Sequence, residues 1–241
     1  MNVDDKTLLM CLSELSRRAP GDGSYVALQD IPFRGHHLLA RAVLGATPEA
    51  GTVFEGGVSS GYFAEVLTNY GLTVDGFELD PVAATEAKKV CRAVHTGDLN
   101  TFDIEGELRD GEYDTIVFGD TLEHLPDPVE VLSRLRPKLT EGGHLVLSVP
   151  NIANWSIRAQ LLSGRFDYRD RGILDRTHLR FFTEKTLRSM LDDARFNVVD
   201  LVGSIPVPAM RSRRACGVAH RLGNLRPQLM AYTFIVTATP H

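Results

Sequence analysis

The stretch Thr52-Val-Phe-Glu-Gly-Gly-Val-Ser-Ser-Gly61 decides the fold of this chain. It is a short apolar run that ends in a carboxylate and then in a glycine-rich turn. Beyond the turn, apolar residues recur every three or four positions, as on one face of a helix: Phe63, Val66, Leu67 and Tyr70. A strand, a glycine turn and a helix in this order predict the first unit of an α/β sheet.

The same alternation of strand and helix continues to Pro150. Two further helices are expected to begin at Asp80-Pro81 and Asp127-Pro128, because an N-cap carboxylate precedes a first-turn proline in each pair. The first of these helices is expected to run to about Cys91. Alternating strands and helices require parallel pairing through right-handed crossovers. Strands are expected at 73–78, 93–96, 113–119 and 144–149, with the turn before the last of them at Gly142-Gly143.

The flanking segments complete a single domain. Helices are expected within 1–20, stopping at Pro20–Gly23, within 33–44 and around 187–194. Strands are expected at 197–201 and 231–238, and these two can form an antiparallel edge. We therefore predict a Rossmann-like, mostly parallel sheet of about seven strands flanked by helices. Its expected parts are an N-terminal helical cap (1–48), a cofactor-binding core (50–150), an inserted substrate cover (151–182), and a C-terminal helix with edge strands (183–241).

Composition narrows the class of protein. The 241 residues are 43% hydrophobic and 24% charged, as in globular domains. The net charge of −5 argues against nucleic acid as the main partner, because phosphate binding depends on Lys and Arg. Cys11, Cys91 and Cys216 show neither disulfide nor zinc spacing. With no secretory signal and no apolar run of membrane-spanning length, a cytoplasmic protein is expected.

Polar residues follow successive strands of the predicted sheet, where ligands bind in such folds. The spacing Gly57-x-Ser59-x-Gly61 differs from the G-x-G-x-x-G fingerprint, which disfavours a dinucleotide dehydrogenase; an ordinary glycine turn is the alternative. Glu78 ends the next strand, roughly 20 residues on, where a carboxylate accepts ribose hydroxyls. Asp98 follows the third strand and is placed to accept from an adenine amino group.

The run from Thr52 to Pro150 resembles the class I S-adenosylmethionine-dependent methyltransferases, and their small-molecule branch most closely. The stretch 113–128 resembles the family's fourth-strand motif, which lies beside the methionine part of the cofactor. The chain departs from the family at Val58 and at Ser59, where the family has glycine, so we expect a slightly remodelled loop. The resemblance implies S-adenosyl-L-methionine as cofactor, S-adenosyl-L-homocysteine as product, and a cofactor site made of Glu55, Gly57, Ser59, Gly61, Glu78, Asp98, Leu99 and Asp120.

Methyl transfer to a hydroxyl also needs a proton acceptor. His124 and His178 are the candidate catalytic residues, with a structural role as the alternative. Ubiquinone-pathway O-methyltransferases carry an acid and then Glu-His at matching positions, and a divalent cation held by Asp120, Glu123 and His124 is possible on that resemblance. We favour a pocket-lining role for these residues and expect no metal.

The expected acceptor is a hydroxyl or amine of a small molecule, such as a sugar, a glycan precursor or a secondary metabolite, acted on by a monomer or homodimer. Two alternatives stay open: a non-catalytic S-adenosylmethionine-binding regulatory protein, and an RNA or protein methyltransferase. The cover contains arginines that can recognise a phosphate or carboxylate or form a solvated face: Arg158, Arg165, Arg169, Arg171, Arg176 and Arg180. A second set raises the RNA alternative, without interleaved aromatics: Arg211, Arg213, Arg214, Arg221 and Arg226.

Overall fold

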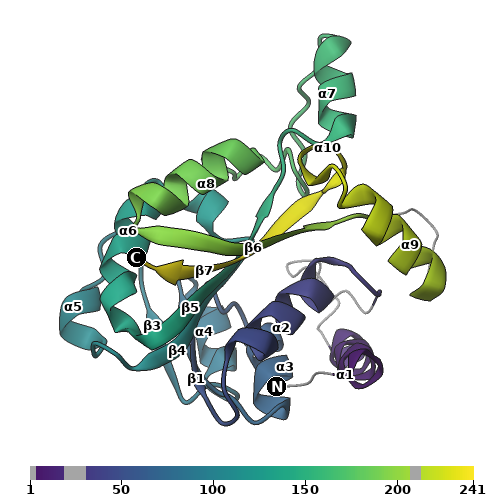
Figure 1. The fold of residues 1–241 in the computed structure, drawn as a ribbon. Coiled ribbons are helices and arrows are strands. Elements are labelled where there is room, and N and C mark those ends of the chain that lie inside the picture. Colours follow the sequence, from purple (N-terminus) through teal and green to yellow (C-terminus); the bar gives the residue numbers. More distant parts are fainter. Residues whose placement is uncertain (1–3, 19–30, 207–212) are drawn as a thin grey trace.

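A twisted sheet runs through the centre of the computed structural model, which describes residues 4–18, 31–206 and 213–241 (Figure 1). Its strand order is β3-β2-β1-β4-β5-β7-β6, which confirms the predicted Rossmann-like sheet of seven strands in the described part of the chain. The strands are β1 (Thr52–Gly56), β2 (Thr73–Glu78), β3 (Ala93–Thr96), β4 (Tyr113–Gly119), β5 (Leu139–Pro150), β6 (Phe196–Ser204) and β7 (Thr233–Pro240).

The direction in which the chain adds strands reverses beside β1. β1 pairs in parallel with β2 on one side and with β4 on the other, and β5 continues the parallel part. β7 is antiparallel to both β5 and β6, so the predicted antiparallel edge is confirmed. The carboxyl ends of β1 and β4 therefore border a topological switch point, where open α/β sheets bind ligands.

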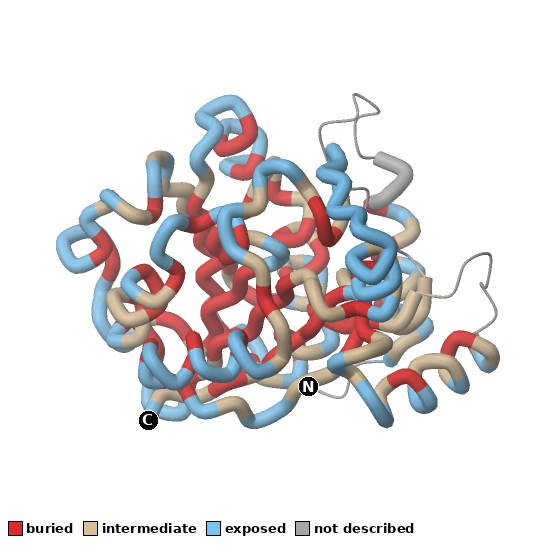
Figure 2. The backbone as a smooth tube through the Cα atoms, turned by 90° about the horizontal axis from the view of Figure 1, so that it is seen from above, coloured by how far each residue is buried: buried red, intermediate tan, exposed pale blue. Residues whose placement is uncertain are grey.

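Helices cover both faces of the sheet (Figure 1). Two buried apolar clusters, one on each face, hold these layers together, and the buried strands run through the middle of the molecule (Figure 2). One face carries α1 (Asp5–Arg18), α2 (Gly35–Ala46), α3 (Tyr62–Asn69) and α4 (Pro81–Ala87); the other carries α5 (Ile104–Glu107), α6 (Pro128–Leu135) and α8 (Glu184–Asp193).

The remaining helices lie outside these layers. They are α7 (Trp155–Leu162), α9 (Arg213–Gly223) and α10 (Pro227–Met230), with short 3-10 turns at Leu122–His124 and Arg136–Lys138. α7 projects from the body of the molecule (Figure 1). Its sequence gives no helical signal because its apolar residues do not recur along one face of the helix. Trp155 and Leu162, for example, are 56% and 89% exposed. None of the helices in the described ranges is long and apolar enough to cross a bilayer.

Two expected boundaries in the parallel core differ from the structure. α4 ends at Ala87, and a turn replaces the expected last helical turn to Cys91. β5 begins at Leu139, so Gly142-Gly143 lies in an irregular stretch of the strand and not in a turn before it. The expected helix stop at 20–23 lies outside the described residues.

A buried carboxylate ties the amino-terminal ends of the strands together. Asp75 on β2 is only 3% exposed and accepts hydrogen bonds from the Tyr113 hydroxyl (3.0 Å) and from Nε of Arg92 (2.9 Å). Arg92 precedes β3 and also bonds Glu112 (2.8 Å). Since a buried charge is tolerated only when it is paired, this network links β2 with the segments that enter β3 and β4.

We predict that removing one hydrogen bond from this network costs less stability than removing the carboxylate at its centre. Tyr113→Phe removes one hydrogen bond and leaves Asp75 paired with Arg92, so the free energy of unfolding should fall by about 1 kcal/mol. Asp75→Ala leaves the buried Tyr113 hydroxyl without its acceptor and should cost about 2–4 kcal/mol. Urea unfolding of both variants measures the difference. Equal losses for the two substitutions would contradict the assignment of Asp75 as the centre of the network.

Candidate active site

A cavity of about 590 Å³ opens at the switch point between β1 and β4. It runs along the carboxyl ends of β1, β2, β3 and β4, so residues far apart in sequence meet in one wall. Its lining includes most of the residues predicted to hold a cofactor: Gly57, Ser59, Glu78, Asp98, Leu99 and Asp120.

The loop after β1 keeps a glycine-like path. Gly57 and Gly61 have φ of +80° and +84°, and Ser59 adopts φ +52° between them. The serine thus keeps a positive φ, a backbone conformation that costs an L-residue roughly 1–2 kcal/mol. The Ser59 amide donates to Oε2 of Glu78 at 2.7 Å, a charge-assisted bond that stabilises this conformation.

Glu78 and Asp98 end neighbouring strands on the same rim. The second carboxylate oxygen of Glu78 accepts from the Asp80 amide at 2.9 Å, so the side chain is fixed at both oxygens. Asp98 accepts from the backbone amide of Asn100 at 2.9 Å. Leu99 is 5% exposed and adds apolar surface to the same cavity. Acidic acceptors beside an apolar wall suit a ligand with hydroxyl donors and a flat apolar ring.

Glu55 lies behind this wall. It is 4% exposed and does not line the large cavity; it borders a small void of about 20 Å³ together with His36 and Asp120. Its Oε2 atom has no hydrogen-bond partner, and burial, followed by the charge of Glu78, raises the pKa of Glu55 well above its ordinary value. Asp120 instead lines the large cavity itself, where it accepts from the Ser148 hydroxyl at 2.9 Å.

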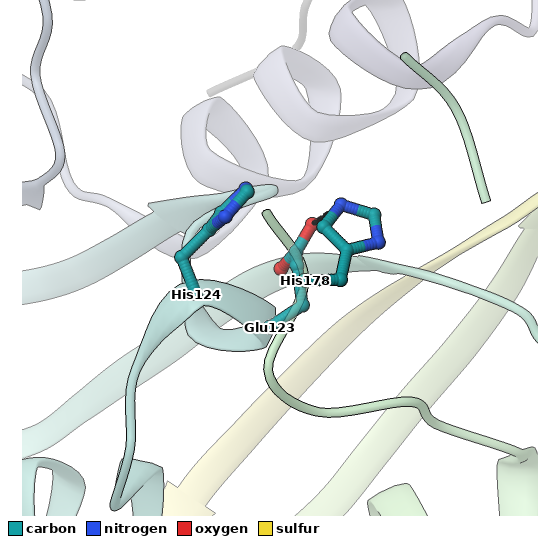
Figure 3. A group of neighbouring side chains, drawn as sticks. All are labelled: Glu123, His124 and His178. Carbon is teal, nitrogen blue, oxygen red and sulfur yellow. Dashed lines mark ion pairs between the residues drawn. The ribbon is translucent and has the colours of Figure 1, made fainter. Parts of the chain in front are cut away.

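The two predicted catalytic histidines lie together. The ring centroids of His124 and His178 are 4.9 Å apart, and Nε2 of His178 lies 3.9 Å from the Glu123 carboxylate (Figure 3). His124 belongs to the turn after β4, and His178 comes from the cover. The cover is held there by the amides of Leu179 and Arg180, which both donate to the Glu123 carbonyl (2.8 and 3.0 Å).

Hydrogen bonds to carbonyl groups assign the tautomer of each ring. Nδ1 of His124 lies 3.2 Å from the Thr177 carbonyl, and Nδ1 of His178 lies 3.2 Å from the Ile173 carbonyl. A carbonyl only accepts, so Nδ1 is the donor in both rings, and Nε2 is not engaged by these carbonyls. Such rings can act as bases or as metal ligands.

Glu123, His124 and His178 each offer one ligand atom, and these atoms lie within 4.8 Å of one another. The structure therefore groups Glu123 and His124 with His178, whereas the sequence suggested Asp120 as the third member. Both carboxylate oxygens of Glu123 are buried without a hydrogen-bond partner, which fits either a protonated acid or a cation ligand. Burial, followed by the charge of Asp120, raises the pKa of Glu123 well above its ordinary value.

Most cover arginines bond within their own segment or to nearby backbone. Arg165 pairs with Asp167, Arg176 pairs with Asp170, and the guanidinium of Arg180 donates to the Pro126 carbonyl. Arg171 also lines a second cavity beside the first, together with Arg34 from the segment before α2. Sequence reasoning missed Arg34 because it stands alone, outside the arginine-rich segment.

Comparison with known proteins assigns the family. A family model described as a methyltransferase domain matches residues 32–201. A ubiquinone biosynthesis O-methyltransferase of Vibrio parahaemolyticus is 29% identical over 161 residues, covering 62% of this chain and 64% of that protein. Its counterpart in Psychrobacter arcticus is 28% identical over 163 residues, covering 63% and 61%. The alignments thus span less than two thirds of these relatives. The chain belongs to the methyltransferase-domain family.

Solved structures agree on the fold. A methyltransferase of Thermotoga maritima, described as a possible histamine N-methyltransferase, superposes with a TM-score of 0.60 at 19% identity, covering 85% of this chain and 88% of that one. A TehB-like methyltransferase of Corynebacterium glutamicum gives 0.58 at 16% identity, covering 98% of both chains. At these identities the likeness concerns the architecture alone.

We predict that the loop after β1 tolerates no side chain at Gly57. A Cβ at Gly57 would lie 2.6 Å from the Thr121 hydroxyl at φ +80°, so Gly57→Ala should lower the free energy of unfolding by about 2–4 kcal/mol. Gly164→Ala is the matched control, because Gly164 has φ +73° and open space around it; only about 1–2 kcal/mol of backbone strain is expected there. Urea unfolding that gives equal losses for both variants would exclude crowding at Gly57.

We predict that the difference in stability between wild type and Glu123→Gln depends on pH. The pKa of Glu123 in the folded protein lies above the unfolded value, so the native state holds a proton that the unfolded chain releases, and stability falls as pH rises above about 4.5. Glu123→Gln removes this loss, so its stability relative to wild type should increase from pH 4 to pH 8 in the presence of EDTA. Glu107→Gln, on exposed α5, is the control. A constant difference for Glu123→Gln across this range would contradict the buried neutral acid.

Proposed function

We propose that this chain is an S-adenosylmethionine-dependent methyltransferase that methylates a hydroxyl or amine of a small molecule, with a hydroxyl favoured. One observation carries the proposal: two cavities, of about 590 and 470 Å³, meet at a wall made by Asp120 and His124. The first has acidic acceptors on its rim, and the second contains imidazoles. A donor site and an acceptor site that share one wall are what methyl transfer requires.

The first cavity supports a nucleoside-bearing methyl donor. In this proposal Glu78 accepts from the ribose hydroxyls, Asp98 and Leu99 contact the adenine, and the loop of Gly57, Ser59 and Gly61 approaches the rest of the ligand. Asp120 borders the methionine part, and Glu55 supports the loop from behind. S-adenosyl-L-methionine supplies the electrophilic methyl group, and S-adenosyl-L-homocysteine leaves as product.

The second cavity supports proton removal from the acceptor. His124 lies on the shared wall and its Nδ1 is held by the Thr177 carbonyl, so we assign its Nε2 as the base that faces the reacting hydroxyl. His178 is the second candidate, and burial, followed by the charge of His124, lowers its pKa, which favours the neutral ring. The expected parts of the domain keep their roles in this proposal, with residues 151–182 as the cover of the acceptor cavity.

We predict that Glu78 contributes to cofactor affinity. Glu78→Ala removes a charged acceptor whose hydrogen bond to the ligand contributes about 1.5–3 kcal/mol of binding free energy. The Kd for S-adenosylmethionine should therefore rise roughly 10- to 150-fold. Glu107→Ala, an exposed glutamate on α5, should leave the Kd unchanged. Isothermal titration calorimetry measures both variants. If Glu78→Ala binds the cofactor as wild type does, the ribose assignment is wrong.

The histidines should act on turnover and not on cofactor binding. With an acceptor found by screening hydroxyl compounds for S-adenosylhomocysteine release, His124→Ala should lower kcat about 10²- to 10⁴-fold, the usual contribution of a positioned base. His178→Ala should lower it as well, while the Kd for S-adenosylmethionine stays within about twofold in both variants. Wild-type turnover by either variant at neutral pH removes that histidine from the mechanism.

Dialysis against EDTA distinguishes a mechanism that uses an imidazole base alone from one that needs a metal ion. A mechanism that depends on imidazole alone should keep full activity, because no cation takes part. Activity that is lost and then restored by Mg²⁺ or Zn²⁺ would assign Glu123, His124 and His178 as cation ligands instead. Cytoplasmic location and a monomeric or dimeric state remain predictions from the sequence.

A further inference from the structure

The second cavity separates its charged groups by sign. Its volume is about 470 Å³, within the range of small-molecule sites, and its walls come from the start of α2, the end of β5, the cover and the start of β7. Acidic groups and imidazoles line one end of it. Arg34 and Arg171 line the part of it near Ser204 and Tyr232, and the turn in which the Asp175 amide donates to the Gly172 carbonyl (3.0 Å) joins the two parts.

Hydrogen bonds of Thr177 hold the imidazole end together. Asp175 accepts from the amide (2.8 Å) and hydroxyl (2.6 Å) of Thr177, and the Thr177 carbonyl bonds His124. Although burial opposes the shift, these bonds lower the pKa of Asp175. The carboxylate is thus ionised and engaged within its own turn. Glu123 and His178 complete this end, and Nε2 of His178 lies 3.9 Å from the Glu123 carboxylate.

The arginine end is built from three segments in contact. The Ser204 hydroxyl donates to the carbonyl of Phe33, the residue before Arg34, at 3.4 Å. The amide of Tyr232 donates to the Ser204 carbonyl at 2.9 Å. A side chain at Gly172, next to Arg171, would collide with the Tyr232 hydroxyl. Arg34, Ser204, Tyr232 and Arg171 therefore border the same end of the cavity.

Guanidinium groups at this end suit an anionic ligand. Both side chains stay charged at neutral pH, and their planar donors match the oxygens of a carboxylate or phosphate. Burial lowers the pKa of Arg34, as expected for a cation in a less polar surrounding than water. An anion placed there would contact two arginines from different parts of the chain, the segment before α2 and the cover.

We propose that Arg34 and Arg171 bind a carboxylate or phosphate of the acceptor, so that its hydroxyl lies at the imidazole end beside Asp120 and His124. This inference rests on the proposed methyl transfer. In that step the hydroxyl proton passes to Nε2 of an imidazole and the oxygen lone pair forms the new C–O bond. The S–CH₃ bond breaks with its electrons going to sulfur, which leaves the neutral thioether.

Matched probes test the anion site. Binding of 4-hydroxybenzoate, 4-hydroxyphenyl phosphate and the neutral 4-hydroxybenzamide is measured by calorimetry with saturating S-adenosylhomocysteine. Wild type should bind at least one anion about tenfold or more tightly than the amide, as charge-assisted hydrogen bonds require. The stronger of the two anions identifies the group that is recognised. Arg34→Gln and Arg171→Gln should each lose most of this preference.

Arg165→Gln is the control within the cover, because Arg165 pairs with Asp167 and lies outside the cavity lining; it should keep the preference. No preference in wild type, no binding of any probe, or an unchanged preference in both Arg34→Gln and Arg171→Gln would overturn the proposal. Affinity for S-adenosylmethionine is measured on every protein. A wild type that fails to bind it contradicts the proposed function, whereas normal cofactor binding without anion preference contradicts only the arginine assignment.

Discussion

The hydrogen bond between the Ser59 amide and the Glu78 carboxylate is the contact on which the donor cavity depends. It joins the loop after β1 to the end of β2 and stabilises a left-handed serine that would otherwise be strained. Because the same carboxylate also accepts from the Asp80 amide, this rim of the cavity is held in place by contacts within the protein. A rim of this kind needs little reorganisation on binding, which reduces the entropic cost of association.

The parallel core was predictable because its signals are local. The apolar runs at 52–56, 73–78, 93–96 and 113–119 lie between turn residues, and Asp80 caps its helix through the Val82 amide as its position before proline suggests. These signals can be read from neighbouring residues alone, without knowledge of the rest of the chain. The cofactor loop and the acid at Glu78 then follow from the sheet, since the carboxyl ends of neighbouring strands share an edge.

The acceptor side was less predictable because its contacts are long-range. Nothing local indicates that Arg34 and Tyr232, almost 200 residues apart, border one cavity. Nor does the sequence show that His178, from the cover, joins Glu123, because that meeting depends on two backbone amides donating to a single carbonyl. Residue types alone suggested the histidines, and only the path of the cover shows that they are neighbours.

Anchoring of the cover at Glu123 has a kinetic consequence. The amides of Leu179 and Arg180 attach the proposed cover to the turn that carries His124, so the cover and the residue proposed as proton acceptor are held together. Opening the cover would break these bonds and also the contact between Nδ1 of His124 and the Thr177 carbonyl. In the proposed mechanism, exchange of acceptor and product by this route therefore cannot take place at the same time as proton transfer to His124.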